Sequence, residues 1–114
     1  MSTVQFFSST APQVPANTRT NTLNCLFPAG RTCKEAWVLG RAAPDSVLEV
    51  RLIGQRNEPL SDVSQLYGAN DVSRTRMLNV NVPAGSFPPV VRLEAKNTSG
   101  KASAWVEGVQ LVFD

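Results

Sequence analysis

The end of the chain reads Ala-Ser-Ala-Trp-Val-Glu-Gly-Val-Gln-Leu-Val-Phe over residues 102–113. Apolar and polar side chains alternate through much of this stretch, which is the pattern of a half-buried β-strand. Gly108 interrupts the alternation, and a glycine inside a strand often marks a β-bulge. A bulge at Glu107–Gly108 predicts that Trp105 and Gln110 point outward. The core side of the strand would then carry Val106, Val109, Leu111 and Phe113.

The same period recurs in short segments that are separated by turn residues. Residues 47–54 show it most clearly, because Leu48, Val50 and Leu52 would all point inward. The other predicted strands cover residues 21–27, 33–41, 77–82 and 90–96. Short strands with proline and glycine turns and almost no helix predict an all-β fold, an antiparallel β-sandwich that is jelly-roll-like.

Alternation also predicts which side chains of the earlier strands are buried. In residues 33–41 the period places Trp37 and Leu39 in the core. In residues 21–27 the inward face would consist of Leu23, Cys25 and Phe27. The opposite face would consist of Thr22, Asn24 and Leu26.

Residues 55–76 form the longest segment without alternation, and a structureless loop of that length is unusual inside a compact domain. The segment 61–67 starts with Ser61 and Asp62, which are residue types that cap helices. It would place Val63 near Leu66 on one helical face. We therefore predict one short helix that ends before Gly68.

The first twenty residues predict a short strand followed by an extended arm, and the sandwich domain would cover 21–114. Residues 8–20 contain two prolines and almost no apolar side chains, which favours an extended connector. Arms of this kind often lie on another molecule. The candidate partner contacts of this region are Val4, Phe6, Phe7, Pro12, Val14 and Pro15.

The composition excludes most enzyme classes. The chain has no histidine, so it cannot use a Ser-His-Asp or Cys-His site, or an imidazole zinc ligand. Paired carboxylates remain a route to glycoside hydrolysis, but the candidates read as charges on solvated strand faces. These candidates are Glu35, Glu49, Glu94 and Glu107. We predict a non-enzymatic protein without cofactor or metal.

Cys25 and Cys33 lie symmetrically about Ala29, so a hairpin that turned there would place them opposite each other. The pair could form a disulfide or remain as two buried thiols, and thiols are favoured in a reducing compartment. Two cysteines without histidine cannot complete a structural zinc site.

The net charge is +2, and the arginines are scattered, so no basic stripe predicts nucleic-acid binding. No apolar run reaches membrane-spanning length, and the first residues lack the pattern of a signal peptide. These features predict synthesis in the cytosol and no membrane partner. The acceptor-like Asn97-Thr98-Ser99 is explained as part of a hairpin turn.

Exposed aromatic residues are the remaining candidates for binding. Trp105 would point outward and Tyr67 lies in the long loop, so both could stack on a sugar or contact a protein. The segment 82–87 leading into 91–95, with the closing strand 104–112, resembles the C-terminal third of carbohydrate-binding jelly-roll modules. That resemblance implies glycan binding as an alternative function.

The whole chain resembles the small decoration or cement proteins of tailed bacteriophages in size, composition and expected architecture. The resemblance implies a structural protein on the virion surface, made in the host cytoplasm. It further implies contacts with the major capsid protein and with copies of itself, as a dimer or trimer.

Overall fold

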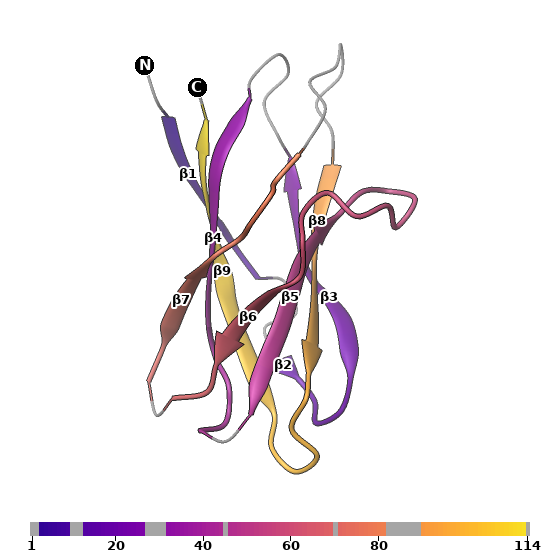
Figure 1. The fold of residues 1–114 in the computed structure, drawn as a ribbon, viewed down its shortest axis with the longest axis vertical. Coiled ribbons are helices and arrows are strands. Elements are labelled where there is room, and N and C mark those ends of the chain that lie inside the picture. The colour runs from indigo at the N-terminus through magenta and orange to yellow at the C-terminus, as the bar shows by residue number, and fades with distance from the viewer. Residues whose placement is uncertain are drawn as a thin grey trace.

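The computed structural model describes residues 3–9, 13–26, 32–44, 46–69, 71–81 and 90–113. These residues form nine β-strands in two antiparallel sheets and no helix (Figure 1). The predicted all-β sandwich is therefore confirmed. The strands are β1 Thr3–Ser8, β2 Gln13–Val14, β3 Arg19–Leu26, β4 Cys33–Arg41, β5 Val47–Ile53, β6 Ser64–Tyr67, β7 Ser73–Arg76, β8 Val90–Asn97 and β9 Ala104–Phe113. Within the same ranges, no helix is long and apolar enough to cross a bilayer.

The strand pairings are nested, as they are in a jelly roll. Sheet A has the order β1-β9-β4-β7, with β2 also paired to β9, and sheet B has the order β3-β8-β5-β6. Thus β1 pairs with β9, β3 with β8, β4 with β7 and β5 with β6. Such nesting describes one long antiparallel ribbon, which closes on itself through the β4–β9 and β5–β8 pairs.

The core lies between the two sheets and follows the alternation of β5 and β9. Leu48, Val50 and Leu52 are buried as predicted, and so are Val106 and Val109. Each fully buried side chain of this size stabilises the fold by about 1.5–3 kcal/mol relative to exposure. The predicted bulge is also confirmed, because the β4–β9 register shifts where Glu107 is the extra residue.

Two further bulges were not predicted, and each reverses the alternation. In β3 the register shifts between Asn21 and Leu23, so Thr22 is buried beside Leu23 and donates its hydroxyl to the Leu93 carbonyl (3.3 Å). The prediction that Thr22 points outward was wrong. Leu23, Cys25 and the exposed Asn24 follow the predicted faces, whereas the side chains of Leu26 and Phe27 lie outside the described part.

In β4 the register shifts between Cys33 and Glu35, which leaves Lys34 as the extra residue. The buried positions after it are Ala36, Val38 and Gly40. The prediction that Trp37 and Leu39 are core residues was therefore wrong, because a period of two counted from Cys33 ignores the inserted residue.

The described residues 55–69 and 71–76 contain no helix, so the predicted helix over 61–67 was wrong. Ser64 and Leu66 are buried and Gln65 and Tyr67 are exposed, which is strand alternation over four residues. Ser61 does not cap a helix; its hydroxyl accepts a hydrogen bond from the Leu52 N–H (2.9 Å). The described part of the predicted strand 77–82 is also not a strand, because β7 ends at Arg76.

The described residues of the predicted arm lie on the sandwich of the same chain. Both β1 and β2 pair with β9, and Val14 is fully buried in the core. The buried Asn97 side-chain amide holds this region in place, since it donates to the carbonyls of Val14 (3.1 Å), Pro15 (3.4 Å) and Ala102 (2.8 Å). Asn97 is thus committed to internal hydrogen bonds, which fits its interpretation as a turn residue.

The two cysteines do not lie opposite each other in a hairpin. Cys25 pairs with Val91 in sheet B, and Cys33 pairs with Phe113 in sheet A, because consecutive strands β3 and β4 belong to different sheets. Both are buried free thiols. Burial raises the pKa of Cys25 to about 12, with a further contribution from Cys33, and raises the pKa of Cys33 to about 11.

Candidate protein-interaction surface

The outer face of sheet A carries a strip of apolar side chains that are interspersed with polar ones. The ladder aligns these residues in rows, and the first row joins Val4 of β1 to Val112 of β9 and Glu35 of β4. The second row is Phe6, Gln110, Trp37 and Arg76, the third is Ser8, Gly108, Leu39 and Arg74, and the fourth is Gln13, Trp105 and Arg41. Val4 and Phe6 are 57% and 53% exposed, and Trp37, Leu39, Trp105 and Val112 are partly exposed.

Gly108 is needed for the packing of β1 on this face. A Cβ atom at position 108 would lie 2.6 Å from Cζ of Phe6 and would also strike the backbone oxygen of Phe7. The absence of a side chain therefore lets the Phe6 ring lie over β9. The bulge residue thus shapes the surface as well as the register.

Arginines from β7 border the strip on its far side. The Arg74 guanidinium lies 4.5 Å from the centroid of the Trp37 ring, which is a cation–π contact. Arg76 pairs with Glu35 at 3.4 Å across β4. An apolar centre with arginine at its border is the composition typical of protein interfaces.

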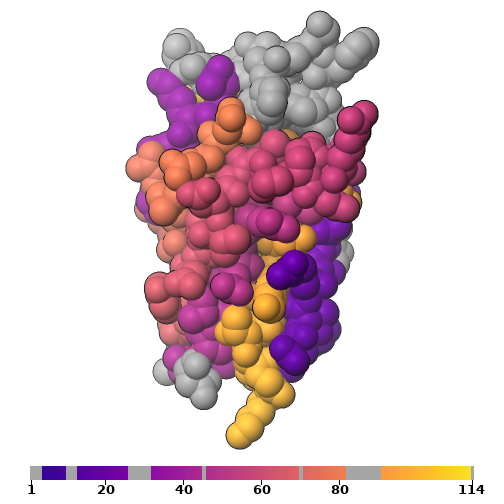
Figure 2. Space-filling view, turned by 45° about the vertical axis from the view of Figure 1, so that its right-hand side comes forward, coloured from indigo at the N-terminus to yellow at the C-terminus, as the bar shows by residue number. Residues whose placement is uncertain are grey.

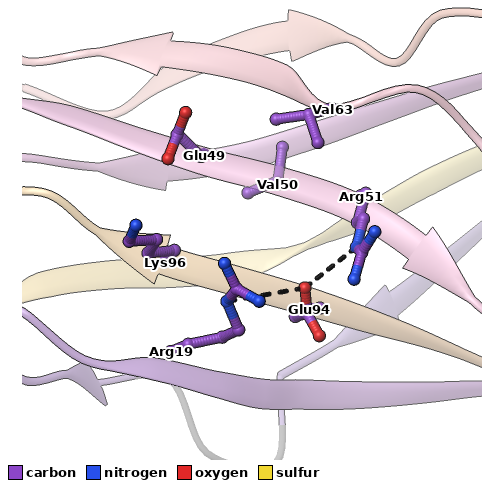
Figure 3. A pocket seen from close by; sticks show the side chains of 7 residues that line it. All are labelled: Arg19, Glu49, Val50, Arg51, Val63, Glu94 and Lys96. Atoms are coloured by element: carbon purple, nitrogen blue, oxygen red, sulfur yellow. Dashed lines mark hydrogen bonds and ion pairs between the residues drawn. The ribbon is translucent and has the colours of Figure 1, made fainter. Parts of the chain in front are cut away.

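Sheet B presents a different outer face. Figure 2 views the molecule from the side on which β3 and β8 lie next to each other. A shallow pocket there is lined by Arg19, Glu49, Val50, Arg51, Val63, Glu94 and Lys96. In Figure 3, Glu94 lies between two arginines, and its Oε1 is 2.9 Å from Nε of Arg51 and 3.8 Å from Nε of Arg19.

The carboxylates considered for hydrolysis are divided between the two faces. Glu49 and Glu94 line the sheet B pocket, whereas Glu35 and the exposed Glu107 belong to sheet A. Glu94 is engaged by two guanidinium groups, so the pocket is a salt-bridged strand face. Across the described ranges, no group of three or more cysteine and acidic side chains could hold a metal ion.

The structure brings together part of the predicted contact set. Val4, Phe6 and Trp105 lie on the outer face of sheet A, and Phe7 packs partly buried against the core. Val14 is in the core, Pro15 is exposed after β2, and Pro12 lies outside the described residues.

Tyr67 does not join Trp105 in one aromatic platform. Tyr67 is 66% exposed on the outer side of β6 in sheet B, and its hydroxyl donates to Gln65 Oε1 (2.8 Å). Trp105 lies on the outer side of sheet A. The two rings therefore face away from each other, and no sugar could stack on both.

Three residues of the strip were missed by the sequence analysis, namely Trp37, Leu39 and Val112. The available signal was that Ala36–Leu39 and Leu111–Phe113 are uninterrupted apolar runs. A strand with apolar residues at both odd and even positions has two apolar faces, and only one of them can point into the core of this sandwich.

No protein-family description matches the chain, and no curated protein matches it in sequence. Solved structures do match in fold. A chain from the structure of infectious bursal disease virus, Gx strain, superposes with a TM-score of 0.56 at 11% identity, and one from the Gt strain with 0.58 at 10%. Each match covers 98% of this chain and 32% of the viral chain, so this chain spans about a third of their length. In fold, the chain is similar to the all-β structure of these viral chains.

Proposed function

We propose that the chain is a non-enzymatic structural protein that decorates or staples a bacteriophage capsid. It would be made in the host cytoplasm and would lie on the virion surface, in contact with the major capsid protein and with copies of itself. The observation that carries the proposal is the apolar outer face of sheet A. Exposed contiguous apolar patches on soluble proteins usually mark protein contacts.

Three further features support this proposal. The jelly-roll topology is shared with chains of a virus structure, although fold alone does not define function. The sheet A face combines tryptophan and arginine, which are the residue types enriched in binding hot spots. Among the described residues, no group of three or more cysteine, aspartate and glutamate side chains could hold a metal ion.

The first test is sedimentation of lysate from the native source, with the chain quantified across the gradient by mass spectrometry. We expect it to migrate with a megadalton particle at a fixed ratio to another protein, and to remain there at moderate salt. Migration only as a free monomer or dimer would contradict the capsid role. Glycan binding through Trp105 would then become the leading hypothesis.

A matched pair of variants assigns the contact to sheet A. Leu39→Glu places a charge in the middle of the apolar strip, and Val63→Glu places the same charge at an exposed apolar site away from it. We expect Leu39→Glu to lower the amount bound to the particle by at least about tenfold, which corresponds to about 1.4 kcal/mol. Equal loss with Val63→Glu would exclude sheet A as the docking face.

A further inference from the structure

Within the described part of the chain, the edges of the two sheets differ in how they are protected from pairing with another chain. Strands β6 and β7 are four residues long, and β7 carries Arg74 and Arg76. Strand β3 starts with Arg19 and contains the bulge at Thr22. Short length, charge and bulges are the usual means of blocking edge-to-edge pairing.

Strand β1 has none of these protections. It is six residues long (Thr3–Ser8), contains no charged residue and no proline, and pairs regularly with β9 over all six residues. Two of its exposed side chains are the apolar Val4 and Phe6. Within the described ranges, no strand pairs with its other side. An edge of this kind is suited to accept another strand.

The backbone of β1 is oriented for such pairing. Directly after β1, the Ser9 N–H donates a hydrogen bond to the carbonyl of Glu107 in β9 (3.1 Å). Backbone groups of successive residues point to opposite sides of a strand, so the amides of Gln5 and Phe7 also point to β9. The N–H and C=O groups of Val4, Phe6 and Ser8 accordingly point to the open side.

We propose that β1 pairs antiparallel with β1 of a second copy of this chain, around a two-fold axis at Gln5. In this register Val4 lies opposite Phe6 of the second copy, and Phe6 lies opposite its Val4. These are the residues whose backbone groups point outward, so each pair exchanges two hydrogen bonds. Gln5 lies opposite Gln5 of the second copy.

The composition of β1 favours a second copy as its partner. An uncharged strand meets no repulsion when it pairs with itself, and aromatic–β-branched pairs across strands stabilise a sheet. The register centred on Phe6 would instead place Val4 opposite serine and Gln5 opposite phenylalanine. The paired sheets would form one continuous sheet, whose outer face combines two copies of the apolar strip.

The test uses the purified chain without any particle, so its result is independent of the proposed capsid role. Sedimentation equilibrium over a range of concentrations should show a monomer–dimer equilibrium. Val4→Lys adds a charge to the edge and should raise the dimer dissociation constant at least about tenfold. The matched control is Val63→Lys, which changes an equally exposed valine on the β6 side and should leave the constant unchanged.

Cysteine cross-linking tests the register. Gln5→Cys should form a disulfide between copies under mild oxidation, because opposite residues near a two-fold axis have the Cα separation that a disulfide needs. Asn24→Cys, on the edge strand β3, is the control and should not cross-link. A strictly monomeric wild-type chain, or an equal effect of Val63→Lys, would overturn the proposal. Cross-linking of Phe6→Cys in place of Gln5→Cys would overturn the register.

Discussion

Sheet A and sheet B both expose one face to solvent in the same jelly roll, but the two faces differ in composition. The central strands of sheet A expose tryptophan, leucine and valine among polar residues, whereas the central strands of sheet B, β5 and β8, expose mainly charged side chains. On sheet B, the ladder places Arg51 beside Glu94, and Arg51 Nε donates a hydrogen bond to Glu94 Oε1 (2.9 Å). On sheet A, rows such as Phe6–Gln110–Trp37 leave apolar area in water. Covering apolar area with a partner contributes about 25 cal/mol per Å², so the apolar side chains on sheet A would gain from a partner.

The largest effect is expected from Gly108→Ala, which breaks the sheet A face. The new Cβ would strike the Phe7 backbone oxygen and the Phe6 ring, so β1 has to move away from β9. Overpacking of this kind should lower the free energy of unfolding by about 3 kcal/mol, measured by urea unfolding.

The matched control is Gly100→Ala, since nothing lies within 4 Å of a Cβ at that position. It should change the free energy of unfolding by less than about 0.5 kcal/mol. Similar losses for both variants would mean that the close approach of β1 to Gly108 does not hold the face together.

The same bulge explains why parts of the fold were predictable. Gly108 is visible in the sequence as a break in alternation, so the faces of β9 were assigned correctly. The bulges at Thr22 and Lys34 contain no glycine, and alternation alone could not locate them. The faces of Thr22 and Trp37 were misassigned for this reason, and the exposed position of Leu39 was missed together with that of Trp37.

The short strands and the sheet order could not be predicted from the sequence, because the short strands carry too little pattern and the sheet order depends on non-local contacts. Strand β6 has only four residues, and a period of two over four residues resembles many other patterns. Cys25 and Cys33 are close in sequence, which favoured a hairpin, but the nested pairing sends β3 and β4 to different sheets. That pairing depends on contacts of β3 with β8 and of β4 with β9, far along the chain.

The two cysteines are buried in the core between the sheets, and a change of pH tests how they affect the stability of the fold. Cys25 and Cys33 have pKa values raised from 9.0 to about 12 and about 11, so the folded state favours the neutral thiols. The unfolded chain releases these protons near pH 9. The stabilisation present below that pH is lost as the pH rises from 9 through about 11 for Cys33 and through about 12 for Cys25.

At pH 10 each thiol should therefore lower the free energy of unfolding by about 1.4 kcal/mol relative to pH 8. Chemical unfolding at both pH values measures this loss for the wild type and for Cys25→Ala. The variant should lose about 1.4 kcal/mol less than the wild type over the same interval. An identical pH dependence would show that Cys25 does not titrate differently in the folded chain.

The smallest effect tests the ion pair on the outer face of sheet B against an ion pair on the outer face of sheet A. Side chains of Arg51 and Glu94 are 29% and 17% exposed, whereas those of Arg76 and Glu35 are 52% and 39% exposed. Glu94→Gln should cost about 1 kcal/mol of unfolding free energy, and Glu35→Gln less than about 0.5 kcal/mol, because water screens the more exposed pair. Urea unfolding at low and high salt measures how the free energy of unfolding depends on salt. We expect Glu94→Gln to reduce this dependence more than Glu35→Gln does. Equal costs would mean that the ion pair of sheet B stabilises the fold no more than the more exposed pair of sheet A.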